Sequence, residues 1–191
     1  MYKTQIEASA LYAEIKRLHD EEGMDFLLNL TGEDWLEDGI GVVYQVENTE
    51  NHKQACVKCV VADRENPMIP SVSDLWDIAN VYEREVYDYY GIIFTNHPDM
   101  RRLFLRTDFN GYPLRKDFDM SPEANQFPLT DEPESDYTVV YSLDADDHLV
   151  ATKKRLFADT AFVVNIGPNN PSSHGVLPLQ TVLDVEKVNR L

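Results

Sequence analysis

The chain has 191 residues, a net charge of −17 and 43% hydrophobic residues. This length and composition suffice for one domain with extensions and a real core, and the excess of acidic residues argues against binding of free nucleic acid. No apolar run reaches the roughly 18 residues of a membrane-spanning helix, and residues 1–23 lack the apolar stretch of a signal peptide. We therefore expect a cytosolic location.

The first part of the chain predicts one helix and a small sheet. Residues 5–22 have helical spacing of apolar side chains, and Gly23 follows as a stop. Three strand-like runs follow at residues 26–30, 40–47 and 55–62, and a short polar turn joins the last two as in an antiparallel hairpin. With a second helix after them, these elements predict an α+β two-layer sandwich, in which a small, mostly antiparallel sheet packs against helices.

Cys56 and Cys59 form a C-x-x-C motif, a spacing found in metal and redox sites. The residues around them read as a strand, however, and residues three apart in a strand point to opposite faces of the sheet. No second cysteine pair or nearby histidine completes a zinc site, and the Glu-x-x-His pairs of di-iron bundles are absent from the sequence. We predict no metal site.

The stretch from residue 72 to residue 118 carries the most information. It begins as an amphipathic helix, for which Ser71 and Ser73 are candidate N-caps, Asp74 is a capping-box partner and Gly91 is a left-handed C-cap. Residues at helical spacing form an apolar stripe that is expected to face the sheet. The members of this stripe are Leu75, Ile78, Ala79, Tyr82, Val86 and Tyr89.

Charged side chains interrupt this helix. Arg84 and Asp88 lie four residues apart opposite the stripe and are expected to pair. Glu85 lies at the edge of the stripe, where a carboxylate needs a partner. Glu83 lies on a second, aromatic side of the helix with Trp76, Tyr87 and Tyr90. Because a helix with two apolar sides packs on both, the second side is a candidate surface for a partner protein.

Two basic clusters follow the helix in this acidic chain. The first is the pair Arg101-Arg102, just after His97-Pro98-Asp99, and the second lies in residues 113–118, which read PLRKDF. Local ion pairs are the plain interpretation of such clusters. The alternative is bidentate pairing with carboxylates at a protein interface, which suits the planar guanidinium of arginine.

These motifs, in this order, resemble the 30 kDa subunit, or C subunit, of respiratory complex I, NADH:quinone oxidoreductase, a module that related membrane-bound hydrogenases share. The resemblance covers roughly residues 25–120. It implies a structural and assembly role without catalytic residues in this module. It marks as signature and interface candidates Glu83, Arg84, Glu85, Asp88, His97, Arg101, Arg102, Arg115, Lys116 and Asp117.

The rest of the chain changes in character. Residues 121–158 are acidic and contain prolines, and they are predicted to form a tail or linker with one short strand at 137–143. Residues 160–166 and 176–183 are β-like and flank a turn-rich loop, which predicts a hairpin. We therefore divide the chain into a domain at 1–120, a linker at 121–158 and a hairpin at 159–191.

The loop of this hairpin resembles a second family. Residues 167–177 are similar to the pattern G-P-x-H-P-x-x-H-G-V-L at the start of the 49 kDa subunit, or D subunit, of complex I. The resemblance implies that His174 contacts the quinone head group, whereas Asn170 replaces the first histidine of the pattern. Since an imidazole can donate a hydrogen bond or a proton near neutral pH, it suits quinone chemistry. The chain is thus expected to be a fused C/D polypeptide that stops early in its D portion.

The two resemblances imply a peripheral-arm subunit of a proton-translocating NADH:quinone oxidoreductase on the cytoplasmic face of the inner membrane. The expected partners are the rest of the 49 kDa-like subunit, the iron-sulfur subunits and, indirectly, the membrane arm. This chain is expected to bind no cofactor and to be inactive alone, while the assembled complex holds quinone, FMN and iron-sulfur clusters. Two alternatives stay open, namely the start of a membrane-bound nickel-iron hydrogenase large subunit and an interaction module without a redox role.

Overall fold

A computed structural model of the chain describes residues 2–106, 109–121, 137–155, 161–169, 177–184 and 187–190. The chain divides into two compact units, one formed by Met1–Glu134 with Val139–Lys153 and the other by Ser135–Thr138 with Lys154–Leu191. No helix in the described part of the chain is both long enough and apolar enough to cross a membrane. The loop that contains Asn170 and His174 lies outside the described residues.

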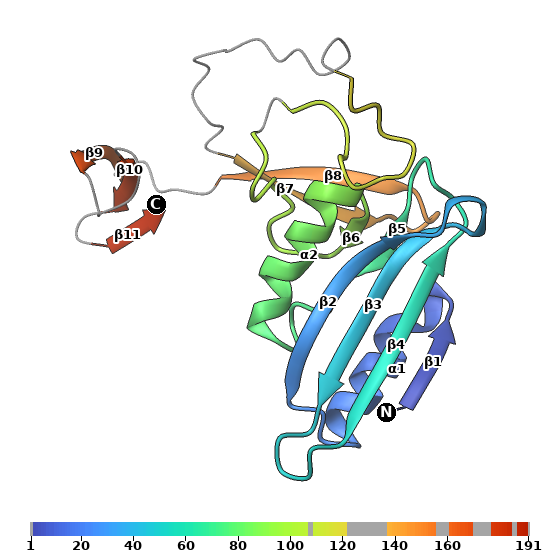
Figure 1. Cartoon of the computed structure of the whole chain (residues 1–191). Coiled ribbons are helices and arrows are strands. Elements are labelled where there is room, and N and C mark those ends of the chain that lie inside the picture. The colour runs from blue at the N-terminus through green and yellow to red at the C-terminus, as the bar shows by residue number, and fades with distance from the viewer. Residues whose placement is uncertain are drawn as a thin grey trace. The chain divides into compact units, whose positions relative to one another are not determined.

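The first unit is built on a four-stranded sheet with the order β1-β4-β3-β2 (Figure 1). Its strands are β1 (Tyr2–Ile6), β2 (Phe26–Asp34), β3 (Ile40–Glu47) and β4 (Gln54–Val61). β1 pairs with β4 in parallel, and the other two pairs are antiparallel. The main helices are α1 (Ala8–Asp20) and α2 (Asp77–Tyr90), and a short 3-10 helix, η1 (Leu36–Asp38), precedes β3.

Among the described residues, the helices cover one face of this sheet. On β3, Val42, Tyr44 and Val46 are completely buried, whereas the alternate residues Val43 and Gln45 remain partly accessible. This alternation is typical of a sheet with helices on one side. The predicted α+β two-layer sandwich with a small, mostly antiparallel sheet is therefore confirmed.

The first helix starts later than predicted. Residues 5 and 6 belong to β1, where Ile6 is in register with Cys59 of β4, and α1 begins only at Ala8. Glu7 between them has an extended backbone. The apolar spacing of Leu11, Ile15 and Leu18 correctly marks the buried face of the helix, but it says nothing of the pairing that draws the preceding residues into the sheet.

The central helix also starts later than predicted. Its N-cap is Trp76, with no side-chain cap, so the predicted caps Ser71 and Ser73 are wrong. Ser71 lies next to β5 (Met68–Pro70), which pairs in parallel with β6 (Ile93–Thr95). The predicted left-handed cap is confirmed, since Gly91 has a φ of 73°, which glycine adopts at little cost.

Two further sheets follow. β7 (Tyr137–Leu143) and β8 (Leu149–Arg155) form a two-stranded sheet, of which β7 was predicted and β8 was not. The loop after β6 is bound to β7, because the amide of Asn96 donates to the carbonyl of Tyr141 at 2.7 Å. In the second unit, β9 (Ala161–Asn169) and β10 (Leu177–Asp184) form the predicted hairpin, and β11 (Lys187–Arg190) adds a third antiparallel strand.

Candidate functional site

The two cysteines lie on opposite faces of β4, as predicted. Cys59 is completely buried under the helices, whereas Cys56 is partly accessible on the open face of the sheet. Burial raises the pKa of the Cys59 thiol to about 12, which makes it a poor nucleophile and a poor metal ligand. The spacing therefore does not bring the two sulfur atoms together in a common site.

Of the two glutamates of α2, Glu83 is completely buried and Glu85 is not. Glu83 is completely buried, and its two oxygens accept hydrogen bonds from the hydroxyl of Ser71 at 2.6 Å and the amide of Val72 at 2.7 Å. Burial nevertheless raises the pKa of Glu83 to about 8. Glu83 therefore ties α2 to the segment after β5, whereas Glu85, predicted to lie at the edge of the apolar stripe, is only partly buried.

His97 lies beside this carboxylate and is equally buried. Its Nε2 is 3.9 Å from Glu83 and 3.1 Å from the carbonyl of Asn80, while its Nδ1 accepts a hydrogen bond from the amide of Asp99 at 2.9 Å. These partners select the neutral ring with the proton on Nε2, and burial lowers the pKa of His97. His97 thus fixes the turn after β6 as an uncharged hydrogen-bonding group, not as an ion-pair partner of Glu83.

Asp88 binds a loop rather than the neighbouring turn of its helix. The predicted pair with Arg84 is not formed; Asp88 is completely buried and contacts Arg102 at 2.9 Å. Its second oxygen accepts hydrogen bonds from three successive amides, those of Leu103, Phe104 and Leu105, at 2.7–3.2 Å. A buried carboxylate needs this number of donors, and the i, i+4 spacing on the helix supplies none of them.

The arginines of the first basic cluster mainly hold backbone. Arg102 donates to the carbonyls of Asp88, Phe109 and Gly111 at 2.9–3.0 Å in addition to the Asp88 carboxylate. Arg84 donates to the carbonyls of Arg101 and Arg102, each at 3.0 Å. Arg101 forms a bidentate pair with nearby Asp99, with a shortest distance of 2.7 Å. The arginines of this cluster therefore form hydrogen bonds and ion pairs within their own chain, as the plain interpretation of the cluster predicted.

The second basic cluster attaches the end of the same loop to the sheet. Arg115 donates to the carbonyls of Tyr90 and Arg64, at 2.6 and 2.9 Å. Arg64 forms an ion pair with Asp34 at the end of β2 and so holds the pKa of that carboxyl well below its usual range. Asp34 also accepts from the amide of Lys116 at 2.8 Å. The described residues of the segments 96–106 and 109–118 are thereby fixed to both α2 and β2.

The structure divides the signature residues into an inner and an outer group. Glu83, Asp88 and His97 are completely buried, so their side chains cannot contact a partner in this fold, and the interface interpretation is corrected for them. Arg84, Arg101, Arg102 and Arg115 lie partly at the surface, and Lys116 and Asp117 are exposed. The remaining signature residue, Glu85, lines a groove.

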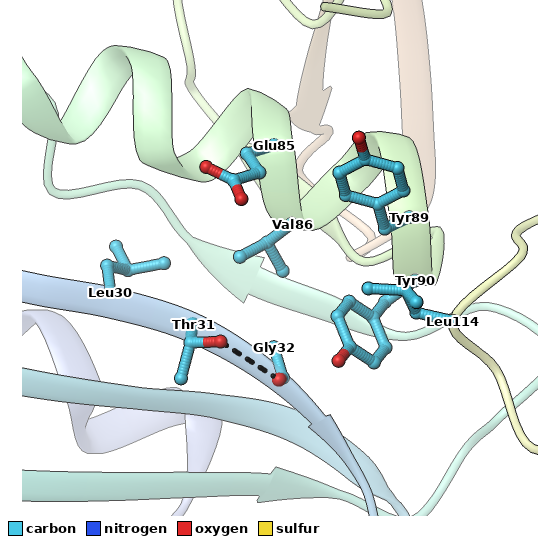
Figure 2. Close-up of a pocket in the computed structure, with 8 residues that line it drawn as sticks. All are labelled: Leu30, Thr31, Gly32, Glu85, Val86, Tyr89, Tyr90 and Leu114. Carbon is cyan, nitrogen blue, oxygen red and sulfur yellow. Dashed lines mark hydrogen bonds between the residues drawn. The ribbon is translucent and has the colours of Figure 1, made fainter. Parts of the chain in front are cut away.

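This groove runs between α2 and β2 (Figure 2). Leu30, Thr31 and Gly32 form its floor on β2, and the carboxylate of Glu85 points into it from α2. Its other lining residues are Val86, Tyr89, Tyr90 and Leu114. Within the described residues, Glu85 forms neither a hydrogen bond nor an ion pair. The groove therefore combines apolar walls with one half-buried carboxylate that this chain does not pair.

Apolar side chains are also exposed on α2 and on the loop that follows it. Ile78 and Val81 are 43% and 41% exposed, and Phe104, which stacks on Tyr89, is 63% exposed. Ile78 was predicted to lie in the core stripe, and this is wrong. The helix is rotated so that Glu83 joins Ala79 and Val86 on its buried face, because Ser71, Val72 and the His97 turn surround that carboxylate.

One group in the described part of the chain has the geometry of a metal site. Asp144, Asp146 and His148 place one ligand atom each within 4.8 Å of one another, all exposed on the turn between β7 and β8. Asp144 already accepts hydrogen bonds from the amides of Asp146 and His148 at 2.9 Å. An acidic turn of this kind forms without an ion, and it is no evidence of a metal centre.

Comparison with known proteins identifies the family. The family model described as "Respiratory-chain NADH dehydrogenase, 30 Kd subunit" matches residues 4–124. Proteins of Phocaeicola vulgatus and Bacteroides thetaiotaomicron, both named as the C/D subunit of an NADH-quinone oxidoreductase, are 44% and 45% identical over 189 and 193 residues. These matches cover 99% and 96% of this chain but 36% of each relative, so the chain spans about a third of the length of these curated relatives.

Other relatives match a smaller share of this chain. The C subunit of the NADH-quinone oxidoreductase of Moorella thermoacetica is 39% identical over 122 residues, which cover 63% of this chain and 82% of that protein. A solved structure of the membrane-bound sulfane sulfur reductase (MBS), an archaeal respiratory membrane complex, contains a chain with 28% identity and a TM-score of 0.57, matched over 69% of this chain and 82% of that one. The chain belongs to the family of the respiratory-chain NADH dehydrogenase 30 Kd subunit.

Proposed function

We propose that this chain is part of the peripheral arm of a proton-translocating NADH:quinone oxidoreductase, as a C/D-type subunit. The observation that supports this most is the match of nearly the whole chain, at 44% and 45% identity, to proteins named as C/D subunits of an NADH-quinone oxidoreductase. Those names favour a quinone reductase over a nickel-iron hydrogenase or an interaction module without a redox role.

The first unit acts as a scaffold in this proposal. Arg84, Arg102 and Arg115 use their guanidinium groups on backbone carbonyls of the segment from residue 90 to residue 111 and of Arg64. Asp34 and Asp88 bind backbone amides of the same region. These hydrogen bonds hold the loop in one conformation. A surface that is rigid before binding loses less conformational entropy when the subunits of a large complex assemble.

We further propose that the chain binds no cofactor itself, and that quinone, FMN and iron-sulfur clusters belong to the assembled complex. Its partners would be the rest of the 49 kDa-like subunit and the iron-sulfur subunits, with the membrane arm contacted indirectly. The complex would lie on the cytoplasmic face of the membrane, and the isolated chain would be inactive. The similarity to a chain of an archaeal respiratory membrane complex supports this general setting.

His174 is proposed to contact the quinone head group. The support is the G-P-x-x-P-x-x-H-G-V-L pattern of residues 167–177, in which His174 occupies the second histidine position. In this proposal the imidazole donates a hydrogen bond or a proton to a quinone oxygen. Asn170, at the first histidine position, has an amide that can donate a hydrogen bond but cannot titrate.

One experiment tests both roles. The complete protein, with an affinity tag, is purified from membranes of its source, and NADH oxidation is measured with a water-soluble quinone. Arg102→Ala should reduce the amount of assembled complex but not the turnover of the complex that remains. His174→Ala should leave the amount unchanged and reduce quinone turnover. Recovery of the tagged protein without other subunits, or without quinone-dependent NADH oxidation, would refute the proposed function.

A further inference from the structure

The sheet of the first unit has an unpaired edge beside α2. β2 is the last strand in the order β1-β4-β3-β2 and pairs with β3 on one side only. Figure 1 shows β2 as the outer strand next to α2. No strand among the described residues pairs with its other edge. Backbone groups at such an edge are free to bind an extended segment of another chain.

The surface along this edge selects the side chains of such a segment. Tyr89 and Leu114 line the groove, and exposed Phe104 stacks on Tyr89. Ile78 and Val81 are also exposed, and they lie seven and four residues before Glu85, which places them on the same side of α2. Between these apolar groups lies Glu85, which has no partner among the described residues. Apolar side chains would therefore be buried at both ends of the groove, and a cation would be favoured at its centre.

The lengths of the elements agree with a short strand. The 14 residues of α2 span about 21 Å at 1.5 Å per residue. An extended segment covers that distance in about six residues at 3.3 Å each. Because alternate side chains of a strand face the same side, three of them would face α2. The middle one would lie opposite Glu85, with an apolar residue two positions before it and another two positions after it.

We propose that an extended segment of another subunit, with an arginine or lysine between two apolar residues at alternate positions, adds to β2 as a fifth strand and places its cation against Glu85. This inference rests on the proposed function, since the partner is taken to be a subunit of the same complex. It adds to that function the surface that binds the partner, the β2 edge with Glu85, and the residue pattern of the partner, a basic residue between two apolar ones.

Photo-crosslinking in the assembled complex tests the inference. Tyr89, on the rim of the groove, is replaced with p-benzoylphenylalanine in the complete protein, and Gln45, on the open face of the sheet, is replaced in the same way as a control. We expect Tyr89 to crosslink to a segment of another subunit with a basic residue and apolar residues two positions on either side. We also expect those amides of residues 27–33 that point away from β3 to exchange at least about tenfold more slowly in the complex than in the free chain.

A charge reversal tests the role of Glu85 itself. Glu85→Lys should reduce the amount of assembled complex by about tenfold or more, because like charges at an interface cost several kcal/mol. Glu50→Lys is the matched control, since Glu50 is exposed in the turn between β3 and β4 and does not line the groove. Substituting Glu for the basic residue of the crosslinked segment should restore assembly of the Glu85→Lys protein.

The outcomes separate this inference from the proposed function. An assembled, active complex in which Tyr89 does not crosslink, or crosslinks to a helix or to a second copy of this chain, would overturn the inference and leave the function intact. Unchanged exchange of the β2 amides that point away from β3, or equal effects of Glu85→Lys and Glu50→Lys, would also overturn it. A protein that purifies without other subunits would overturn both.

Discussion

The contact between Arg102 and Asp88 provides the strongest test of the scaffold. Asp88 is completely buried, and the side chain of Arg102 is only 11% exposed. Arg102→Ala removes the cation and leaves the carboxylate buried with its three amide donors, and it also removes the donor to the carbonyls of Phe109 and Gly111. Loss of one partner from a buried ion pair costs about 3–5 kcal/mol, which is a large part of the roughly 5–15 kcal/mol that stabilises a domain.

Arg101→Ala is the matched control for this change. Arg101 neighbours Arg102 in the sequence, but its side chain is 25% exposed and pairs with Asp99 only two residues away. An ion pair of this kind contributes about 1 kcal/mol or less. In addition, Asp88→Asn combined with Arg102→Ala should be less destabilising than the sum of the two single changes, because the double variant leaves no buried charge unpaired.

Urea unfolding of the 191-residue chain, followed by tryptophan fluorescence, measures these differences. The two tryptophans, Trp35 and Trp76, both lie in the first unit, so the signal reports the unfolding of that unit. The expected order of stability is wild type, Arg101→Ala, then Arg102→Ala. If Arg101→Ala and Arg102→Ala differ by less than about 1 kcal/mol, the pair with Asp88 does not fix the loop as argued.

Three further predictions concern other parts of the first unit. Since burial raises the pKa of Glu83 from 4.5 to about 8, the folded chain retains a proton that the unfolded chain releases in this range. The unfolding free energy should therefore fall as the pH rises from about 4.5 to about 8, by up to about 1.4 kcal/mol per pH unit. Urea titrations of Glu83→Gln should show a flatter profile, and identical profiles would contradict this assignment. Gly32→Ala should destabilise the chain by about 1–3 kcal/mol, because the added methyl group meets the ring of Tyr90; an additional Tyr90→Ala should lower that cost, and purely additive effects would argue against the contact. A thiol reagent should modify Cys56 but not buried Cys59 in the native chain, as peptide mass spectrometry can show; rapid modification of Cys59 would place it outside the core.

Periodicity predicted the parts of the fold that depend on a single element. Strands β3 and β4, the buried face of α1 and the left-handed cap at Gly91 follow from side-chain alternation, helical spacing and local backbone geometry. The errors arose where a distant segment competes for the same residues. Ile6 pairs with β4 instead of continuing a helix, and the hydroxyl of Ser71 binds Glu83 instead of capping α2.

The charged residues of α2 also show that local spacing does not predict partners from distant parts of the chain. The i, i+4 spacing favours an ion pair between Arg84 and Asp88 worth a few tenths of a kcal/mol. Each of the two side chains instead forms several hydrogen bonds with the loop after β6. Asp88, once buried, requires several donors, and the loop of Leu103–Leu105 provides them. The carbonyls of Arg101 and Arg102 in turn require donors, and Arg84 provides them. Local spacing could not predict these partners, because the chain brings them from 14 or more residues away.

This competition also determines which signature residues remain available to a partner. Glu83 and Asp88 are buried, and each is surrounded by donors from its own chain, so their substitution should act through stability. Glu85 lies between them in sequence, points into the groove and binds nothing in the described part of the chain. A half-buried carboxylate without a partner adds nothing to the stability of this chain that glutamine would not. Its presence beside an open strand edge is explained most directly by a cation that another chain supplies, so Glu85→Gln should leave the unfolding free energy unchanged and weaken only assembly.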